Sequence, residues 1–120
     1  MFENEECWVL MGRRIGSIWH ARYDRYTVGQ PAAVRFDPDY IWDNRKRIIG
    51  WLHTHPSFSA TPSSTDNSTM KACVCSLGKP LLCCIRGIDG LRAWWYWDDE
   101  SPGVEGKIIK VGGKLMGWTR

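Results

Sequence analysis

Long apolar runs are absent from this 120-residue sequence, and none approaches the roughly 18 residues that a membrane-spanning helix needs. We therefore expect no contact with a membrane. Internal repeats and low-complexity tracts are also missing. A chain of this length fits one small domain, so we expect a single domain over residues 1–120.

Net charge is also low, at a formal value of +3. Such a mild excess of positive charge gives no support for nucleic-acid binding. The densest basic run is Arg45, Lys46 and Arg47. A solvated helix end explains this run, and contact with an acidic patch of a protein substrate is the alternative.

A disulfide framework is not expected. The cysteine count is odd, we expect no signal peptide, and the spacings fit neither a set of bridges nor a zinc ribbon. Free thiols in a reducing, cytoplasmic compartment are the resulting expectation. Apolar surroundings predict core positions for most of the five cysteines, which are Cys7, Cys73, Cys75, Cys83 and Cys84.

Tryptophan, in contrast, is abundant, with eight residues. Most should lie in the core and in cross-strand pairs, and a few should line a groove or contact a partner. The order of apolar patterns and turn signals predicts an α+β fold with a mainly antiparallel, twisted sheet flanked by helices. Strands are expected at 7–11, 17–26, 34–36, 48–55, 81–86, 91–97 and 107–111, and helices at 38–47 and 65–77.

Particular residues set several of these limits. Gly12 is expected to end the first strand, and Pro56 the fourth. Asp37 and Ser64 are the expected helix caps. Tyr40 and Ile41 should face inward from the first helix, with Asn44 as a further candidate. Residues 27–33 should form a loop, residues 87–90 a hairpin turn, and residues 98–106 an acidic loop, whereas the tail from Gly112 has no assignment.

The segment from His53 to Asp66 carries the clearest chemistry. Residues two apart on a strand point to the same face, so His53 and His55 should present their imidazoles side by side. Pro56 then turns the chain, and the following loop is long enough to return Asp66 to the two rings. Two histidines and one aspartate form a three-ligand zinc site with a free position for water, which is typical of catalytic zinc. Such a site also needs a base.

At this point the sequence resembles the JAMM metalloproteases, also called the MPN-plus or JAB domain. The matching signature is His53-x-His55-Pro56, six residues, then Ser63-x-x-Asp66. Gly50-Trp-Leu before the histidines is also similar to the family, as is a glutamate seven residues before Gly12, which is Glu5. The resemblance covers nearly the whole chain and implies the cytidine-deaminase-like JAB/MPN fold.

The resemblance also implies roles for individual residues. His53, His55 and Asp66 would bind one Zn2+, Glu5 would be the general acid/base, and Ser63 would donate a hydrogen bond to the oxyanion. Glu6 should point to the opposite face of the strand from Glu5. Each role has a structural alternative: exposure near the chain end for Glu5, and helix capping for Ser63 and Asp66.

The function implied by the resemblance is a zinc isopeptidase that cleaves after the C-terminal glycine of a ubiquitin-like modifier. It would deconjugate the modifier or mature its precursor, as in the minimal bacterial forms found in ubiquitin-like and antiphage operons. E1-like and E2-like proteins of the same operon are the further expected partners. The alternatives are a catalytically silent scaffold that binds a partner, and a hydrolase of short peptide or amino-acid adducts of a sulfur-carrier protein.

Overall fold

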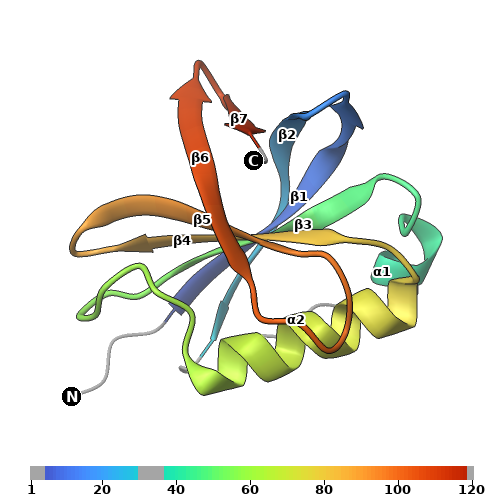
Figure 1. Ribbon diagram of the computed structural model, residues 1–120, viewed down its shortest axis with the longest axis horizontal. Helices are drawn as coiled ribbons and strands as arrows, with labels where there is room; N and C mark the ends of the chain where they lie inside the picture. The colour runs from blue at the N-terminus through green and yellow to red at the C-terminus, as the bar shows by residue number, and fades with distance from the viewer. Residues whose placement is uncertain (1–4, 30–36, 119–120) are drawn as a thin grey trace.

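Seven strands form one closed barrel in the computed structural model, which describes residues 5–29 and 37–118 (Figure 1). The order around the barrel is β1-β2-β7-β6-β5-β4-β3, closed by pairing of β3 with β1. The strands are β1 (Glu5–Ile15), β2 (Ile18–Gly29), β3 (Ile48–Thr54), β4 (Leu81–Gly87), β5 (Gly90–Tyr96), β6 (Val104–Val111) and β7 (Lys114–Trp118). The α+β class with a mainly antiparallel sheet is confirmed, and closure into a barrel is the additional finding.

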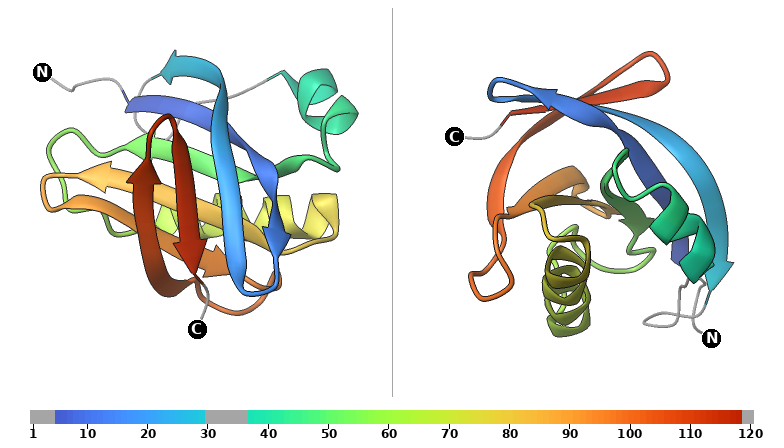
Figure 2. Two further views of the ribbon diagram at one scale, coloured as in Figure 1. Left: turned by 90° about the horizontal axis from the view of Figure 1, so that it is seen from above. Right: turned by 90° about the vertical axis from the view of Figure 1, so that its right-hand side faces the viewer.

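Among these strands one pair is parallel, β3 with β4, and α2 (Ser64–Leu77) connects the two. Parallel neighbours need such a crossover connection. Figure 2 shows α2 lying outside the barrel, along the sheet. The helix buries Met70 and Val74 against a cluster of β4 and β5 side chains that includes Leu81, Cys83 and Tyr96. This packing fixes the start of α2 beside the end of β3.

The barrel interior has its own core. Alternate residues of the strands point inward, and Trp95 and Leu52 are almost completely buried there. Trp19 packs edge-on against Trp95. Several tryptophans are therefore core residues, as expected. A third cluster, of Val9, Met11 and Ile48, lies on the outer face of the barrel and is covered by α1 (Pro38–Asp43).

The first strand does not end at Gly12 as predicted, because β1 continues to Ile15. A Cβ at Gly12 would lie 1.8 Å from the carbonyl oxygen of His20 on β2. Glycine at this position thus allows the close approach of β1 and β2 and does not end the strand. The second strand also exceeds the prediction and reaches Gly29, whereas the predicted strand at 34–36 lies outside the described residues.

The first helix is shorter than predicted and ends at Asp43. The Asn44 side-chain amide donates to the Tyr40 main-chain carbonyl at 2.9 Å. The main-chain carbonyl of Asn44 accepts from the main-chain N–H of Arg47 at 2.9 Å. These local bonds replace the continuing helical ladder. Asp37 is the cap as predicted, and Tyr40 and Ile41 pack inward as predicted.

The last two strands differ from the prediction, because β6 begins at Val104 and β7 was not foreseen. A turn at Gly112 and Gly113 joins them, and Gly112 has a φ of 61°. A Gly-Gly pair is a hairpin signal, so the sequence did contain the information. The hairpin predicted at 87–90 is confirmed between β4 and β5. No described helix has the length and apolar character that crossing a membrane requires.

Candidate metal centre

The two histidines come from the end of β3. Their side chains lie on the outer face of the barrel, opposite to the inward-pointing Leu52. The Nε2 atoms of His53 and His55 are 3.2 Å apart, so the predicted pairing of the imidazoles is present. His55 follows the last residue of β3, and its main-chain N–H still donates to the carbonyl of Arg86 on β4 at 2.8 Å. The second histidine is therefore fixed by the neighbouring strand.

Asp66 joins the two rings from the first turn of α2. Its Oδ1 lies 3.2 Å from His53 Nε2, and its Oδ2 lies 3.1 Å from His55 Nε2. The loop after Pro56 thus returns the carboxylate to the histidines, as the spacing predicted. Each carboxylate oxygen of Asp66 contacts one imidazole, so Asp66 holds the two rings next to each other.

Glu5 approaches the same point from β1. Its Oε1 lies 3.7 Å from His55 Nε2, and its side chain is 14% exposed. Ligand atoms of Glu5, His53 and His55 all lie within 4.8 Å of one another, which makes these three side chains a candidate metal-binding group. The main-chain N–H of Glu6 donates to Thr54 Oγ1 at 2.9 Å, and the Glu6 side chain is hydrogen-bonded to Tyr26. The structure therefore brings Glu5, and not Glu6, to the histidines.

The separations fit a tetrahedral ion. Atoms bonded to one zinc at about 2.0–2.1 Å lie about 3.3 Å apart at the tetrahedral angle. Three separations are close to this value: 3.2 Å between the two Nε2 atoms, 3.2 Å from Asp66 Oδ1 to His53 Nε2, and 3.1 Å from the other oxygen, Asp66 Oδ2, to His55 Nε2. The donors are two imidazoles and carboxylates, a set that zinc accepts. His53 and His55, with a carboxylate from Asp66 or Glu5, thus form a candidate site for such an ion.

The imidazole of His55 is also held through its second nitrogen, Nδ1. Its Nδ1 lies 2.9 Å from the main-chain carbonyl oxygen of Ser59. A carbonyl oxygen only accepts, so Nδ1 must carry the hydrogen in this contact. Nε2 is then left to bind a metal, which is the usual arrangement of a metal-binding histidine. The sequence could not reveal this contact, because Ser59 contributes only its backbone.

In the metal-free protein the electrostatics of the site pair Asp66 with the two imidazoles. Burial raises the pKa of the Asp66 carboxyl, but hydrogen bonds from His53 and His55 outweigh it and hold that pKa well below its usual range. The hydrogen bond to Asp66 raises the pKa of His55, against the opposing effect of burial. Burial and the charges of Glu5 and Asp66 raise the pKa of the Cys7 thiol to about 12. Cys7 is therefore a neutral packing group beside the site.

Ser63 caps α2, and the prediction that Ser64 is the cap is wrong. Ser63 Oγ accepts from the main-chain N–H of Asp66 at 3.1 Å, and the main-chain N–H of Ser63 donates to Asp66 Oδ2 at 2.9 Å. This capping box forms when the third helical residue can reach back to the cap, and only Ser63 has Asp66 at that position. Ser63 and Asp66 are thus capping residues as well as site residues.

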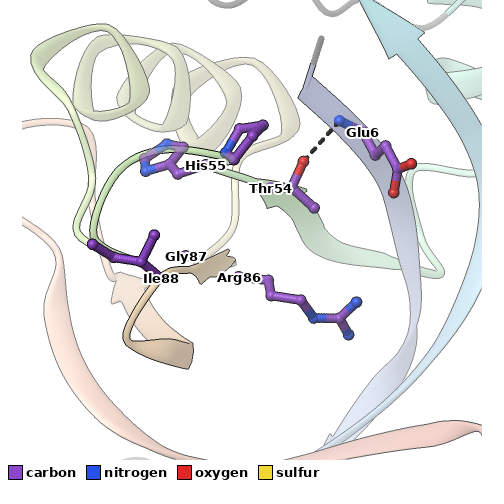
Figure 3. Close-up of a pocket in the computed structure, with 7 residues that line it drawn as sticks. Glu6, Thr54, His55, Arg86, Gly87 and Ile88 are labelled. Atoms are coloured by element: carbon purple, nitrogen blue, oxygen red, sulfur yellow. Dashed lines mark hydrogen bonds between the residues drawn. The ribbon is translucent and has the colours of Figure 1, made fainter. Parts of the chain in front are cut away.

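A pocket of about 460 Å³ adjoins the metal centre (Figure 3). Its lining includes His55 and Pro56, which follow β3, and Ile88 at the turn after β4. Figure 3 shows the side chains of Glu6 and Arg86 at the pocket from β1 and β4. The volume is in the range of ligand sites, which is about 300–1,000 Å³. No sequence pattern pointed to Arg86, since a single arginine after an apolar strand carries no motif.

All five cysteines are free, and Cys7, Cys83 and Cys84 are buried. Burial raises the pKa values of Cys83 and Cys84 well above the usual thiol range. These two thiols are therefore core groups, as expected from the sequence.

The family comparison agrees with this geometry. The sequence profile of the prokaryotic homologs of the JAB domain matches residues 1–97, which include all five predicted site residues. The match ends after β5, so the β6–β7 hairpin that completes the barrel lies beyond it. No curated protein matches the chain. Because the matched region is well over half of the sequence, this chain belongs to the family of prokaryotic homologs of the JAB domain.

Proposed function

We propose that this protein is a zinc-dependent isopeptidase that cleaves after the C-terminal glycine of a ubiquitin-like modifier. The observation that carries the proposal is the convergence of four metal-binding or proton-transferring side chains at one point: Glu5, His53, His55 and Asp66. Membership of the JAB family, whose active members are typically metallohydrolases, supports the same reaction class. Release from a conjugate and maturation of a precursor need the same chemistry.

His53, His55 and Asp66 would hold the zinc ion. When bound, zinc lowers the pKa of a coordinated water towards ~7 and polarises a carbonyl oxygen. In the metal-free protein the pKa of Asp66 is held well below its usual range, so Asp66 would offer a negative charge to an arriving ion. The Ser59 carbonyl holds His55 in the orientation that presents Nε2.

Glu5 would move the proton. Its carboxylate lies beside His55 without taking one of the short contacts that Asp66 makes, at 3.7 Å instead of 3.1 Å. We infer that it accepts a proton from the attacking water and passes it to the departing amine, the usual sequence for a general acid/base. The 14% exposure of its side chain leaves it accessible to water and substrate.

Ser63 would stabilise the charge that develops on the carbonyl oxygen. Its Oγ accepts the Asp66 N–H in the cap, while its hydroxyl hydrogen is still able to donate to a substrate. A donor aimed at the developing oxyanion is a large contribution in acyl transfer. The helix cap fixes the direction of Oγ, which keeps this donor in place.

The pocket next to His55 would hold the substrate residue that flanks the scissile bond. Glu6 and Arg86 give it one charge of each sign, which favours a polar substrate segment. Glycine at the cut would let the substrate backbone approach the metal closely, because a side chain there would clash. We also propose E1-like and E2-like partners and a cytoplasmic location, where the five free thiols would be stable.

The test uses a ubiquitin-like modifier fused through its C-terminal glycine to a reporter protein, together with a short peptide of the same terminal sequence. We expect zinc-dependent cleavage of the fusion after the glycine, slowed by a factor of about 10² or more in Glu5→Gln. Cleavage of the short peptide alone would favour the adduct hydrolase. Zinc binding without cleavage of either substrate would favour the silent scaffold.

A further inference from the structure

The peptide group between Ser59 and Ala60 is hydrogen-bonded on both sides. Its carbonyl oxygen accepts from His55 Nδ1 at 2.9 Å, and its N–H donates to Asp89 Oδ1 at 2.6 Å. The carbonyl and the N–H belong to one planar unit, so the two contacts polarise each other. A carboxylate, a peptide group and a metal-binding imidazole thus form a continuous chain of hydrogen bonds.

The turn after β4 holds the same loop by backbone contacts. The main-chain N–H of Ile88 donates to the carbonyl of Phe58 at 2.9 Å. A Cβ at Gly87 would lie 2.4 Å from the nitrogen of Ala60, so loop and turn are in direct contact. Figure 3 shows this turn, with Gly87 and Ile88, beside the loop that begins at His55. Ala60 is completely buried, so its N–H depends on Asp89 for a partner.

We propose that Asp89 is a positioning residue that fixes the orientation and tautomer of His55 through the peptide group of Ser59 and Ala60. A negative charge on Asp89 makes the Ser59 carbonyl a stronger acceptor, which retains the hydrogen on Nδ1 and leaves Nε2 for the metal. Carboxylates often bind directly behind metal-binding histidines. In this protein a peptide group lies between the two. The proposal extends the proposed zinc function, and its hydrogen-bond chain is testable without zinc.

Arg92 holds Asp89 in place. Its Nη1 lies 3.1 Å from Asp89 Oδ2, while its Nε and Nη2 bind the two oxygens of Glu105 at 2.8 and 2.9 Å. The hydrogen bond from the Ala60 N–H is the largest effect that lowers the pKa of Asp89. Asp89 is thus ionised, and one of its oxygens remains committed to Ala60 while the other binds Arg92.

The arginine provides a matched control. Asp89→Asn removes the charge that faces Ala60, and Glu105→Gln removes the other carboxylate of Arg92 without touching Ala60. Both variants lose one negative charge from the same ion-pair network. A structural effect of the network alone would act equally in both, whereas a relay to His55 would act only in Asp89→Asn.

Two readouts decide the proposal. The first is zinc affinity, measured by competition with a chromophoric chelator. We expect Asp89→Asn to bind zinc about 10-fold or more weakly, as for other outer contacts of metal-binding histidines, and Glu105→Gln to change little. The second is solvent exchange of the His55 Nδ1 hydrogen in the metal-free protein, measured by NMR. About 10-fold faster exchange in Asp89→Asn alone would correspond to the loss of roughly one hydrogen bond.

Equal effects of the two substitutions, or no effect of Asp89→Asn on either readout, would overturn the proposal. The second readout separates it from the proposed function. A wild-type protein that binds no zinc but shows exchange dependent on Asp89 would refute the zinc isopeptidase and retain the relay. Normal zinc affinity, normal exchange of the Nδ1 hydrogen and normal cleavage of the modifier fusion in Asp89→Asn would refute the relay and retain the zinc isopeptidase.

Discussion

Ser63 and Asp66 exchange a reciprocal pair of hydrogen bonds at the start of α2, at 2.9 and 3.1 Å. The same Asp66 carboxylate also contacts both histidines. The start of the helix and the metal centre therefore share one side chain. A change at the cap should consequently affect both helix stability and the site.

Replacement of Ser63 by alanine should affect stability and catalysis together. Loss of the cap should cost about 1 kcal/mol of unfolding free energy. Loss of the hydroxyl donor should lower kcat by about 10² if Ser63 stabilises the oxyanion. Ser63→Thr, which keeps the hydroxyl, should restore most of both, and Ser64→Ala is the neighbouring control. Urea denaturation and steady-state kinetics are the measurements, and a Ser63→Ala variant with normal kcat would remove the oxyanion role.

Substitutions of Glu5 and of Asp66 should have different effects on zinc content and on kcat. We expect Glu5→Gln to keep about one zinc per chain and to lose a factor of about 10² or more in kcat, since it would lack only the proton carrier. Asp66→Asn should lose zinc, because a ligand charge is removed. Metal analysis and kinetics on both variants test this, with Glu6→Gln as the control. Loss of zinc in Glu5→Gln would identify Glu5 as a metal ligand.

Gly87→Ala should disturb the metal centre from a distance. The new methyl group would meet the backbone of the His55 loop, at 2.4 Å from Ala60 N and 2.6 Å from Phe58 O. Overpacking of this kind costs roughly 1–3 kcal/mol, and the shifted loop should weaken zinc binding. Gly113→Ala is the matched control, because a Cβ there has no neighbour within 4 Å. Thermal unfolding with and without zinc measures both effects, and equal behaviour of the two variants would contradict the prediction.

The stabilisation by zinc should increase with pH. His55 has a raised pKa, so its pairing with Asp66 stabilises the metal-free protein fully below about pH 6.5 and is lost as pH rises through the raised value. Asp66 has a lowered pKa, so its contribution is present above about pH 4 and is lost only as pH falls through the lowered value. Zinc needs neutral imidazoles and competes with this pairing at lower pH.

We therefore expect added zinc to raise Tm more at about pH 8 than at about pH 6, with cleavage activity following the same trend. Calorimetry of the chelator-treated protein with and without zinc measures the difference. The double variant His53→Ala/His55→Ala should show no zinc effect at either pH. A zinc-induced shift in Tm that is equal at the two pH values would contradict metal binding through these histidines.

Several errors of the sequence prediction have one cause, which is that a local pattern has more than one structural reading. Gly12 reads as the end of a strand, but the backbone of His20 makes it a point of close approach between β1 and β2. Ser63 and Ser64 are both good caps by type, and the choice depends on which has an acidic partner at the third helical position. The Gly-Gly turn before β7 was readable, and its signal was missed.

The sequence by itself determined the α+β class, the family resemblance and the residues of the candidate metal centre, because strand alternation puts His53 and His55 on one face and the signature supplies Glu5 and Asp66. Closure of the barrel, the assignment of the cap to Ser63 and the contact of Asp89 with Ala60 were decided only by the tertiary structure. Each of these depends on groups from different elements or on backbone atoms. Backbone atoms are common to every residue, so no pattern of side chains could mark them in advance.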